Sequence, residues 1–176
     1  TGEVKNPIET NIVGIYGPLV TATFPTQHRV ATRLGFLLGW QRKSSLHVLD
    51  LGAGTGIFSR AWRRWADGEV IAVEPSPAMR AKFTESGDLD AIRVVAGRAD
   101  ALPVRDSAVD ICWLSAVIHH LGDPSGWVPE LRRVTRPAGV VLIRGLFADQ
   151  SAPPGLQLLP GWQTALSVFP TTTELA

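Results

Sequence analysis

Short apolar runs alternate with amphipathic segments along most of the chain. Five apolar runs have the length of strands buried on both faces, and they occupy residues 46–51, 69–74, 91–96, 109–114 and 140–146. Three segments between them have the spacing or the start signals of helices, and they occupy residues 57–65, 76–84 and 124–134. Strands that alternate with helices imply βαβ units. The chain is therefore predicted to be an α/β protein with a Rossmann-like, doubly wound parallel sheet of which five strands are visible.

The two ends of the chain carry a weaker pattern than the centre. Residues 1–27 are rich in Gly, Pro and Thr, with a short helix expected near residues 12–16, and residues 28–40 have helical spacing. After residue 148 the pattern fades into a proline-bearing loop and the start of another helix. The sequence therefore predicts three parts, which are an N-terminal helical cap over residues 1–45, a core over residues 46–148 and an incomplete C-terminal segment over residues 149–176.

Composition and charge narrow the class of protein. The 176 residues are 45% hydrophobic, which suits one globular domain, and the net charge of +1 gives no overall attraction for nucleic acid or an anionic membrane. No apolar run reaches the about 20 residues that span a bilayer, and the N-terminus lacks the order of a signal peptide. No Cys/His cluster has zinc spacing, and the single Cys112 is expected to be a buried thiol. We therefore expect a cytoplasmic protein with no metal site and no nucleic-acid or membrane partner.

Three alternating glycines follow the first strand of the predicted core. Gly52, Gly54 and Gly56 permit positive φ and let a ligand approach the backbone, and the helix that follows presents free N–H groups. The dinucleotide fingerprint G-x-G-x-x-G/A, counted from Gly52, requires its third small residue at position 57. The chain has the branched Ile57 there. Asp50, just before the turn, can pair with an amino group but would repel a pyrophosphate. The turn therefore favours a nucleotide-like ligand other than a dinucleotide.

Glu74 ends the second strand of the predicted core, 22 residues beyond Gly52. A carboxylate at that place can accept hydrogen bonds from both hydroxyls of a ribose. Taken alone, Glu74 is equally well explained as a surface residue at a strand end. Together with the glycine turn, it favours a ribose-binding role.

The order of several motifs resembles that of class I S-adenosylmethionine-dependent methyltransferases. Residues 48–56 (VLDLGAGTG) resemble the glycine-rich motif I of that family, and residues 72–79 (AVEPSPAM) resemble its acidic motif II. Residues 97–103 (GRADALP) are similar to the loop that recognises adenine, and residues 130–139 (ELRRVTRPAG) to the segment before strand five. The resemblance runs from about residue 46 to residue 146. It is nearest to the subgroup that includes the ubiquinone and menaquinone biosynthesis C-methyltransferases and many small-molecule enzymes.

The resemblance implies a site for S-adenosylmethionine as cofactor, with S-adenosylhomocysteine as the product. The backbone at Gly52, Ala53 and Gly54 would line the methionine portion. Asp50 would lie near the amino group of that portion, and Glu74 would hold the ribose hydroxyls.

The adenine end of the cofactor would meet two segments that follow strands. By the resemblance, Pro75, Ser76 and Met79 would pack near the adenine. Asp100 would accept a hydrogen bond from the adenine amino group, and the N–H of Ala101 would face the ring.

Residues past the fourth strand of the predicted core would lie near the methyl group. By the resemblance, Ser115 and Ala116 would face the methionine portion. His119 and His120 follow, and a histidine is suited to remove a proton from an acceptor near neutral pH. Such a pair occurs throughout the resembling subgroup with unlike substrates, which favours a structural part. A catalytic role for His119 or His120 is therefore a hypothesis that stands beside a packing role.

The leading hypothesis is S-adenosylmethionine-dependent methyl transfer to a small-molecule acceptor at oxygen, nitrogen or carbon, with Tyr16 and Phe24 as candidate acceptor contacts. One alternative is a non-catalytic binding or regulatory module, because the chain stops before the C-terminal hairpin that normally completes the sheet of the resembling family. Another is an NAD-dependent oxidoreductase. A missing hairpin would leave the fifth predicted strand exposed, and homo-oligomer formation through that open edge is a further expectation.

Overall fold

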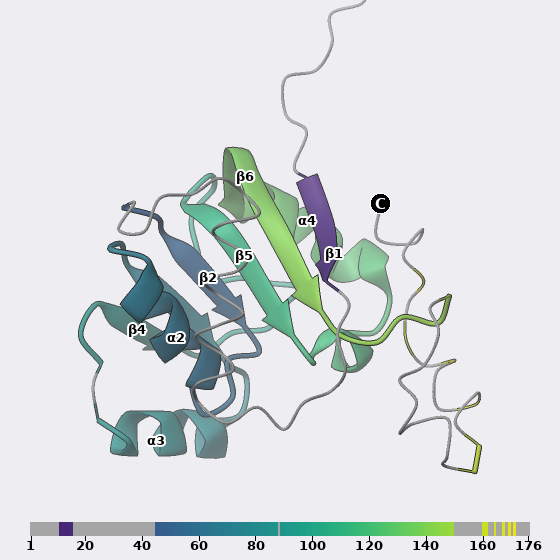
Figure 1. Ribbon diagram of the computed structural model, residues 1–176, viewed down its shortest axis with the longest axis horizontal. Coiled ribbons are helices and arrows are strands. Elements are labelled where there is room, and N and C mark those ends of the chain that lie inside the picture. The colour runs from purple at the N-terminus through teal and green to yellow at the C-terminus, as the bar shows by residue number, and fades with distance from the viewer. Residues whose placement is uncertain are drawn as a thin grey trace, which may run out of the picture.

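The structure is a computed structural model that describes residues 11–15, 45–87 and 89–149, with a few isolated positions between 160 and 171. Its sheet contains β1 (Asn11–Ile15), β2 (Val48–Leu51), β3 (Val70–Val73), β4 (Ile92–Val95), β5 (Val109–Ser115) and β6 (Thr135–Arg144). The order across the sheet is β1-β6-β5-β2-β3-β4, and every neighbouring pair is parallel (Figure 1). The winding reverses between β2 and β5, which is where ligands bind in open sheets of this kind.

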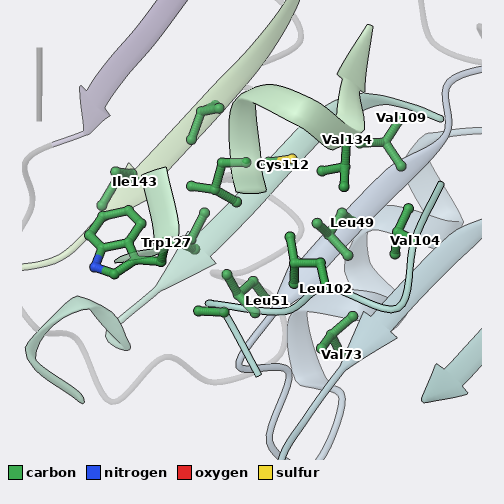
Figure 2. Packing of buried hydrophobic residues seen from close by; sticks show 14 of the residues in the cluster. Leu49, Leu51, Val73, Leu102, Val104, Val109, Cys112, Trp127, Val134 and Ile143 are labelled. Carbon is green, nitrogen blue, oxygen red and sulfur yellow. The ribbon is translucent and has the colours of Figure 1, made fainter. Parts of the chain in front are cut away.

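Helices cover both faces of the sheet. On one face, α2 (Ile57–Trp65) and α3 (Pro77–Glu85) supply Trp62 and Phe83 to a core that also contains Trp113 of β5. On the other face, α4 (Pro124–Val134) packs Trp127 against a second core that contains Cys112, the buried thiol that was predicted (Figure 2). A short 3-10 helix, η1 (Ile118–His120), follows β5. The predicted Rossmann-like, doubly wound α/β fold is confirmed.

The helix boundaries follow signals that are visible in the sequence. The bounds of α2 are those that the sequence predicts. At the start of α3, the Ser76 hydroxyl accepts a hydrogen bond from the Met79 N–H at 3.3 Å, and Pro77 occupies the first turn. At the start of α4, the Asp123 carboxylate accepts from the Ser125 N–H at 2.9 Å. These local hydrogen bonds satisfy backbone donors that the helices leave free at their N-termini.

β6 starts earlier than the predicted strand over residues 140–146. It includes the Pro-Ala-Gly segment at residues 137–139, which lies between the predicted helix over residues 124–134 and the predicted strand. Thr135 pairs with Val109, and the register between β5 and β6 then shifts before regular pairing resumes. The Pro-Ala-Gly segment is therefore accommodated as an irregularity inside the strand and does not end it.

The segment near residues 12–16 is strand β1, so the prediction of a short helix there is wrong. Asn11 pairs in parallel with Val140, and Ile15 with Arg144. The segment is too short for periodicity to decide between helix and strand, and its backbone partners come from β6, far along the chain. β1 covers the edge of β6, so the expectation of an open edge there is also wrong. Homo-oligomer formation stays a prediction, but an open edge at β6 no longer supports it.

Several predictions concern residues that the structure does not describe. The helix over residues 28–40, the contacts of Tyr16 and Phe24, and most of the C-terminal segment over residues 149–176 lie outside the described residues and stay predictions. Within the part of the chain that is described, no helix combines the length and the apolar character needed to cross a bilayer.

Candidate functional site

The carboxyl ends of the central strands meet at one edge of the sheet, beside the reversal of winding (Figure 1). Leu51 of β2 pairs with both Val73 of β3 and Leu114 of β5, so these strands end at the same level. The residues that follow this level are Gly52, Glu74 and Ser115. The structure therefore brings together three predicted site residues that are far apart in the sequence.

The three glycines of the turn serve two different purposes. Gly52 and Gly56 have φ of +72° and +82°, and a Cβ would collide with the Val117 side chain or with the Phe83 ring, respectively. Gly54 also has a positive φ, +56°, but a Cβ there would meet no atom of the described residues within 4 Å. Packing thus explains the outer glycines, whereas the space beside Gly54 is open to a ligand.

Glu74 joins the glycine turn to the start of α3. The residue is only 7% exposed. Its Oε2 accepts a hydrogen bond from the Gly54 N–H at 2.9 Å, and its Oε1 accepts from the Ser76 N–H at 2.8 Å. Each oxygen of an ionised carboxylate can accept more than one hydrogen bond. The protein therefore fixes the carboxylate and leaves acceptor capacity on both oxygens, as a ribose diol would require.

Asp50 is buried at the junction of β2 and α2. It is 2% exposed, and its carboxylate accepts a hydrogen bond from the Ser59 hydroxyl at 2.5 Å. Burial raises the pKa of Asp50 from 3.8 to about 7; the Ser59 hydrogen bonds oppose this rise, and the charge of Glu74 adds to it. The only feature of Ser59 that is visible in the sequence is a hydroxyl in the first turn of the predicted helix. The predicted approach of Asp50 to the methionine amino group stays a prediction.

Asp100 and Ala101 lie in the loop that follows β4. Both oxygens of Asp100 accept hydrogen bonds from the Arg98 guanidinium at 3.0 Å, and these hydrogen bonds lower the pKa of Asp100. The Ala101 N–H donates to the Arg98 carbonyl at 3.2 Å. An adenine amino group would therefore share the Asp100 carboxylate with Arg98. The predicted contact of the Ala101 N–H with the ring would have to displace the hydrogen bond to Arg98.

α4 fixes the continuation of this loop. The Leu102 N–H donates to Glu130 Oε2 at 2.7 Å. Arg133 donates to the carbonyls of Leu102 and Val104 at 3.1 and 2.8 Å, and it also binds Glu130. The segment over residues 130–139, which resembles a family motif, thus holds the loop that resembles the adenine-recognition loop.

The predicted adenine contacts at the start of α3 face solvent at the same edge. Pro75 is exposed, and Met79 is 42% exposed although it is a large apolar side chain. Ser76 is half-buried because it caps α3 and donates its N–H to Glu74. Pro75 and Met79 are therefore accessible to a ligand that lies against Glu74.

Ser115 accepts a hydrogen bond from a cation, Arg144, that the sequence pattern does not indicate as a site residue. Arg144 Nη1 donates to the Ser115 Oγ at 3.1 Å, and the Arg144 Cζ lies 5.7 Å from the centroid of the Phe58 ring. Ala116, at a φ of +55°, donates its N–H to the Arg144 carbonyl at 2.7 Å. The signal in the sequence is a lone arginine inside the apolar run over residues 140–146.

His119 and His120 follow the same edge, in η1. Their ring centroids are 3.9 Å apart, and the Phe169 ring lies 5.0 Å from His119. Burial lowers the pKa of His119, and the neighbouring His120 adds to this effect. Val117, two residues before the pair, packs at Gly52. The pair is therefore near the glycine turn and engaged in ring packing, and its catalytic role stays a hypothesis.

A family model, two relatives and a solved structure that this chain resembles are all methyltransferases. The family model for a methyltransferase domain matches residues 49–143. The malonyl-[acyl-carrier protein] O-methyltransferase of Pectobacterium atrosepticum is 39% identical over 120 residues, which cover 68% of this chain and 45% of that protein. The protein of the same name from Serratia marcescens is 37% identical over 108 residues, which cover 57% of this chain and 38% of that protein. A solved SAM-dependent methyltransferase from Aquifex aeolicus shares the fold at a TM-score of 0.57 and 20% identity, covering 83% and 86% of the two chains.

The family match runs from β2 to β6 and contains the glycine turn, Glu74, the loop at Asp100 and the His pair. The chain spans less than half the length of these two curated relatives. The match nevertheless covers more than half of this chain, and the fold agrees with it. The chain therefore belongs to the methyltransferase domain family, as a class I, S-adenosylmethionine-dependent member.

Proposed function

We propose that this chain transfers the methyl group of S-adenosylmethionine to a small-molecule acceptor. The observation that carries the proposal is the open space beside Gly54, next to the fixed carboxylate of Glu74. A Cβ would fill that space, and the carboxylate keeps acceptor capacity on both oxygens. These two features fit the methionine and ribose portions of the methyl donor.

Different site residues would bind the methionine, ribose and adenine portions of the donor. The backbone from Gly52 to Gly54 would line the methionine portion, beside Asp50, and Ser115 would face the same portion from β5. Glu74 would accept hydrogen bonds from the ribose hydroxyls. Pro75 and Met79 would hold the adenine, near the loop that contains Asp100 and Ala101.

S-adenosylmethionine, when bound, supplies a methyl group on a cationic sulfur. That methyl group would pass to the acceptor, and the electron pair of the broken carbon–sulfur bond would stay on sulfur. The chain contributes by holding the two reactants in line and by excluding water. His119 or His120 would serve as the base for an acceptor that must lose a proton. An acceptor that is already an anion needs no base.

The named relatives and the motif resemblance favour different acceptor atoms. Relatives named malonyl-[acyl-carrier protein] O-methyltransferases favour a carboxylate oxygen. The resemblance to ubiquinone and menaquinone biosynthesis enzymes favours carbon. We favour the carboxylate, because these relatives are 39% and 37% identical to this chain over the matched residues, whereas the other resemblance rests on short motifs. Release of S-adenosylhomocysteine in a screen that contains carboxylate, phenol and quinol-type acceptors distinguishes the two.

Gly54→Ala and Gly87→Ala form a matched pair that tests the open space at the turn. Both glycines have positive φ, +56° and +67°, and neither added Cβ would meet a described atom within 4 Å. Each variant should therefore lose about 1 kcal/mol of unfolding free energy. Only Gly54→Ala should lower the affinity for S-adenosylhomocysteine, by tenfold or more, because its methyl group occupies the space assigned to the donor. Isothermal titration and thermal denaturation measure the two effects.

The comparison has a clear negative outcome. If Gly54→Ala binds S-adenosylhomocysteine as tightly as Gly87→Ala and the unmodified chain, the donor does not lie against Gly54. The observation that carries the proposed function would then be lost.

A further inference from the structure

Arg144 ends β6 and lies at the edge of the sheet where the site is formed. It pairs in register with Ser115, the last residue of β5, and its carbonyl accepts from the Ala116 N–H. β5 separates β6 from β2, which leads into the glycine turn. The backbone of Arg144 is therefore two strands away from that turn, at the same level.

The guanidinium is turned back across β5 toward α2. It donates to Ser115 Oγ at 3.1 Å, and its Cζ lies 5.7 Å from the centroid of the Phe58 ring. Phe58 is the second residue of α2, directly after the glycine turn. A side chain that reaches both groups has its cationic end between the end of β5 and the start of α2. This places a cation beside the surface assigned to the methyl donor.

No carboxylate balances this cation within the described part of the chain. Other arginines bind an Asp or Glu, as Arg63 does Asp90 and Arg136 does Asp110. Arg144 forms no ion pair with any residue that the structure describes, and its side-chain hydrogen bond there goes to the neutral Ser115 hydroxyl. Burial lowers the pKa of Arg144, which reflects the cost of a cation that is partly removed from water without a counter-ion. A bound anion would offset that cost.

We propose that Arg144 receives a carboxylate of a ligand bound at this edge. Its guanidinium has five N–H donors in a planar arrangement that matches the two oxygens of a carboxylate. The Ser115 hydroxyl and the Phe58 ring hold the guanidinium in place, so little conformational freedom is lost on binding. The carboxylate comes either from the methionine portion of the donor or from the acceptor. The inference rests on the proposed function for the identity of these ligands.

Two pairs of probes distinguish the sources of the carboxylate. S-adenosylhomocysteine carries the methionine carboxylate, whereas 5′-methylthioadenosine keeps the adenosine and lacks it. Malonyl-CoA carries a terminal carboxylate, whereas acetyl-CoA lacks it; both are titrated with and without saturating S-adenosylhomocysteine. The variants are Arg144→Gln, which removes the charge, and Arg144→Lys, which keeps the charge without the planar donor pair. Arg105→Gln is the control, because it removes an exposed arginine from the opposite, amino-terminal end of β5.

Arg144→Gln should lower the affinity for one carboxylate-bearing probe by about tenfold or more. Its affinity for the matching probe without the carboxylate should not change. Arg144→Lys should lose less, and Arg105→Gln nothing. A loss confined to S-adenosylhomocysteine assigns the methionine carboxylate, and a loss confined to malonyl-CoA assigns the acceptor. If Arg144→Gln stays folded and changes the affinity for neither carboxylate-bearing probe, the proposal is wrong. If the unmodified chain fails to bind S-adenosylhomocysteine, the proposed function fails, whereas the malonyl-CoA titration without donor still tests Arg144.

Discussion

Replacing Glu74 with alanine should lower the affinity for S-adenosylhomocysteine by about 100-fold. The loss corresponds to two hydrogen bonds from the ribose hydroxyls to a charged acceptor, at about 1.5 kcal/mol each. The substitution also leaves the N–H groups of Gly54 and Ser76 without the acceptors that they have in the structure. The unfolding free energy should therefore fall by roughly 2 kcal/mol as well. Isothermal titration gives the affinity, and chemical denaturation gives the unfolding free energy.

Glu69 is the matched control for Glu74, because it precedes β3 as Glu74 follows it. Glu69 is partly exposed and pairs with Arg93 at 3.0 Å, at the opposite edge of the sheet. Glu69→Ala should leave the affinity for S-adenosylhomocysteine unchanged, because Glu69 lies at the end of β3 away from the site. It should also change the unfolding free energy little, since exposed ion pairs contribute little to stability. Equal affinities of Glu69→Ala and Glu74→Ala would show that Glu74 does not hold the ribose.

The Asp50→Asn variant should become more stable than the unmodified chain as the pH rises from about 4 to above 7. The pKa of Asp50 is 3.8 in an unfolded chain and about 7 in the folded protein, because burial opposes ionisation. Between these values the folded state holds a proton that the unfolded state has released, so the stability of the unmodified chain falls as pH rises. The accumulated difference is about 4 kcal/mol. The asparagine variant does not titrate at this position and should escape the loss.

Denaturant unfolding of the two proteins at a series of pH values measures this effect. The informative quantity is the difference between the two unfolding free energies, because titrations that both proteins share cancel in it. A difference that stays constant from pH 4 to pH 7.5 would mean that Asp50 ionises normally inside the fold. The hydrogen bond to Ser59 would then offset the effect of burial on the pKa of Asp50.

The sequence predicted the elements whose signals are local. α2 and α4 have the predicted bounds because caps, prolines and the spacing of apolar residues lie within the helices themselves. β2, β3 and β5 were found because each is a short apolar run buried on both faces. The placement of Gly52, Glu74 and Ser115 at one edge follows from that order of parallel strands.

The features that the sequence did not predict depend on contacts between distant segments. The sequence predicts a helix where β1 lies, because the partner of β1, strand β6, is more than a hundred residues further along the chain. Ser59 and Arg144 were missed because a buried hydrogen bond and a side chain turned across a neighbouring strand leave no periodic signal. The engagement of the Ala101 N–H by Arg98 likewise depends on loop geometry that spacing does not encode.

Titration of the unmodified chain with S-adenosylhomocysteine and with NAD is the most direct test of the central claim. The glycine turn, the Glu74 carboxylate and the open space beside Gly54 predict saturable, one-to-one binding of S-adenosylhomocysteine and no binding of NAD. Binding of NAD without binding of S-adenosylhomocysteine would contradict the account.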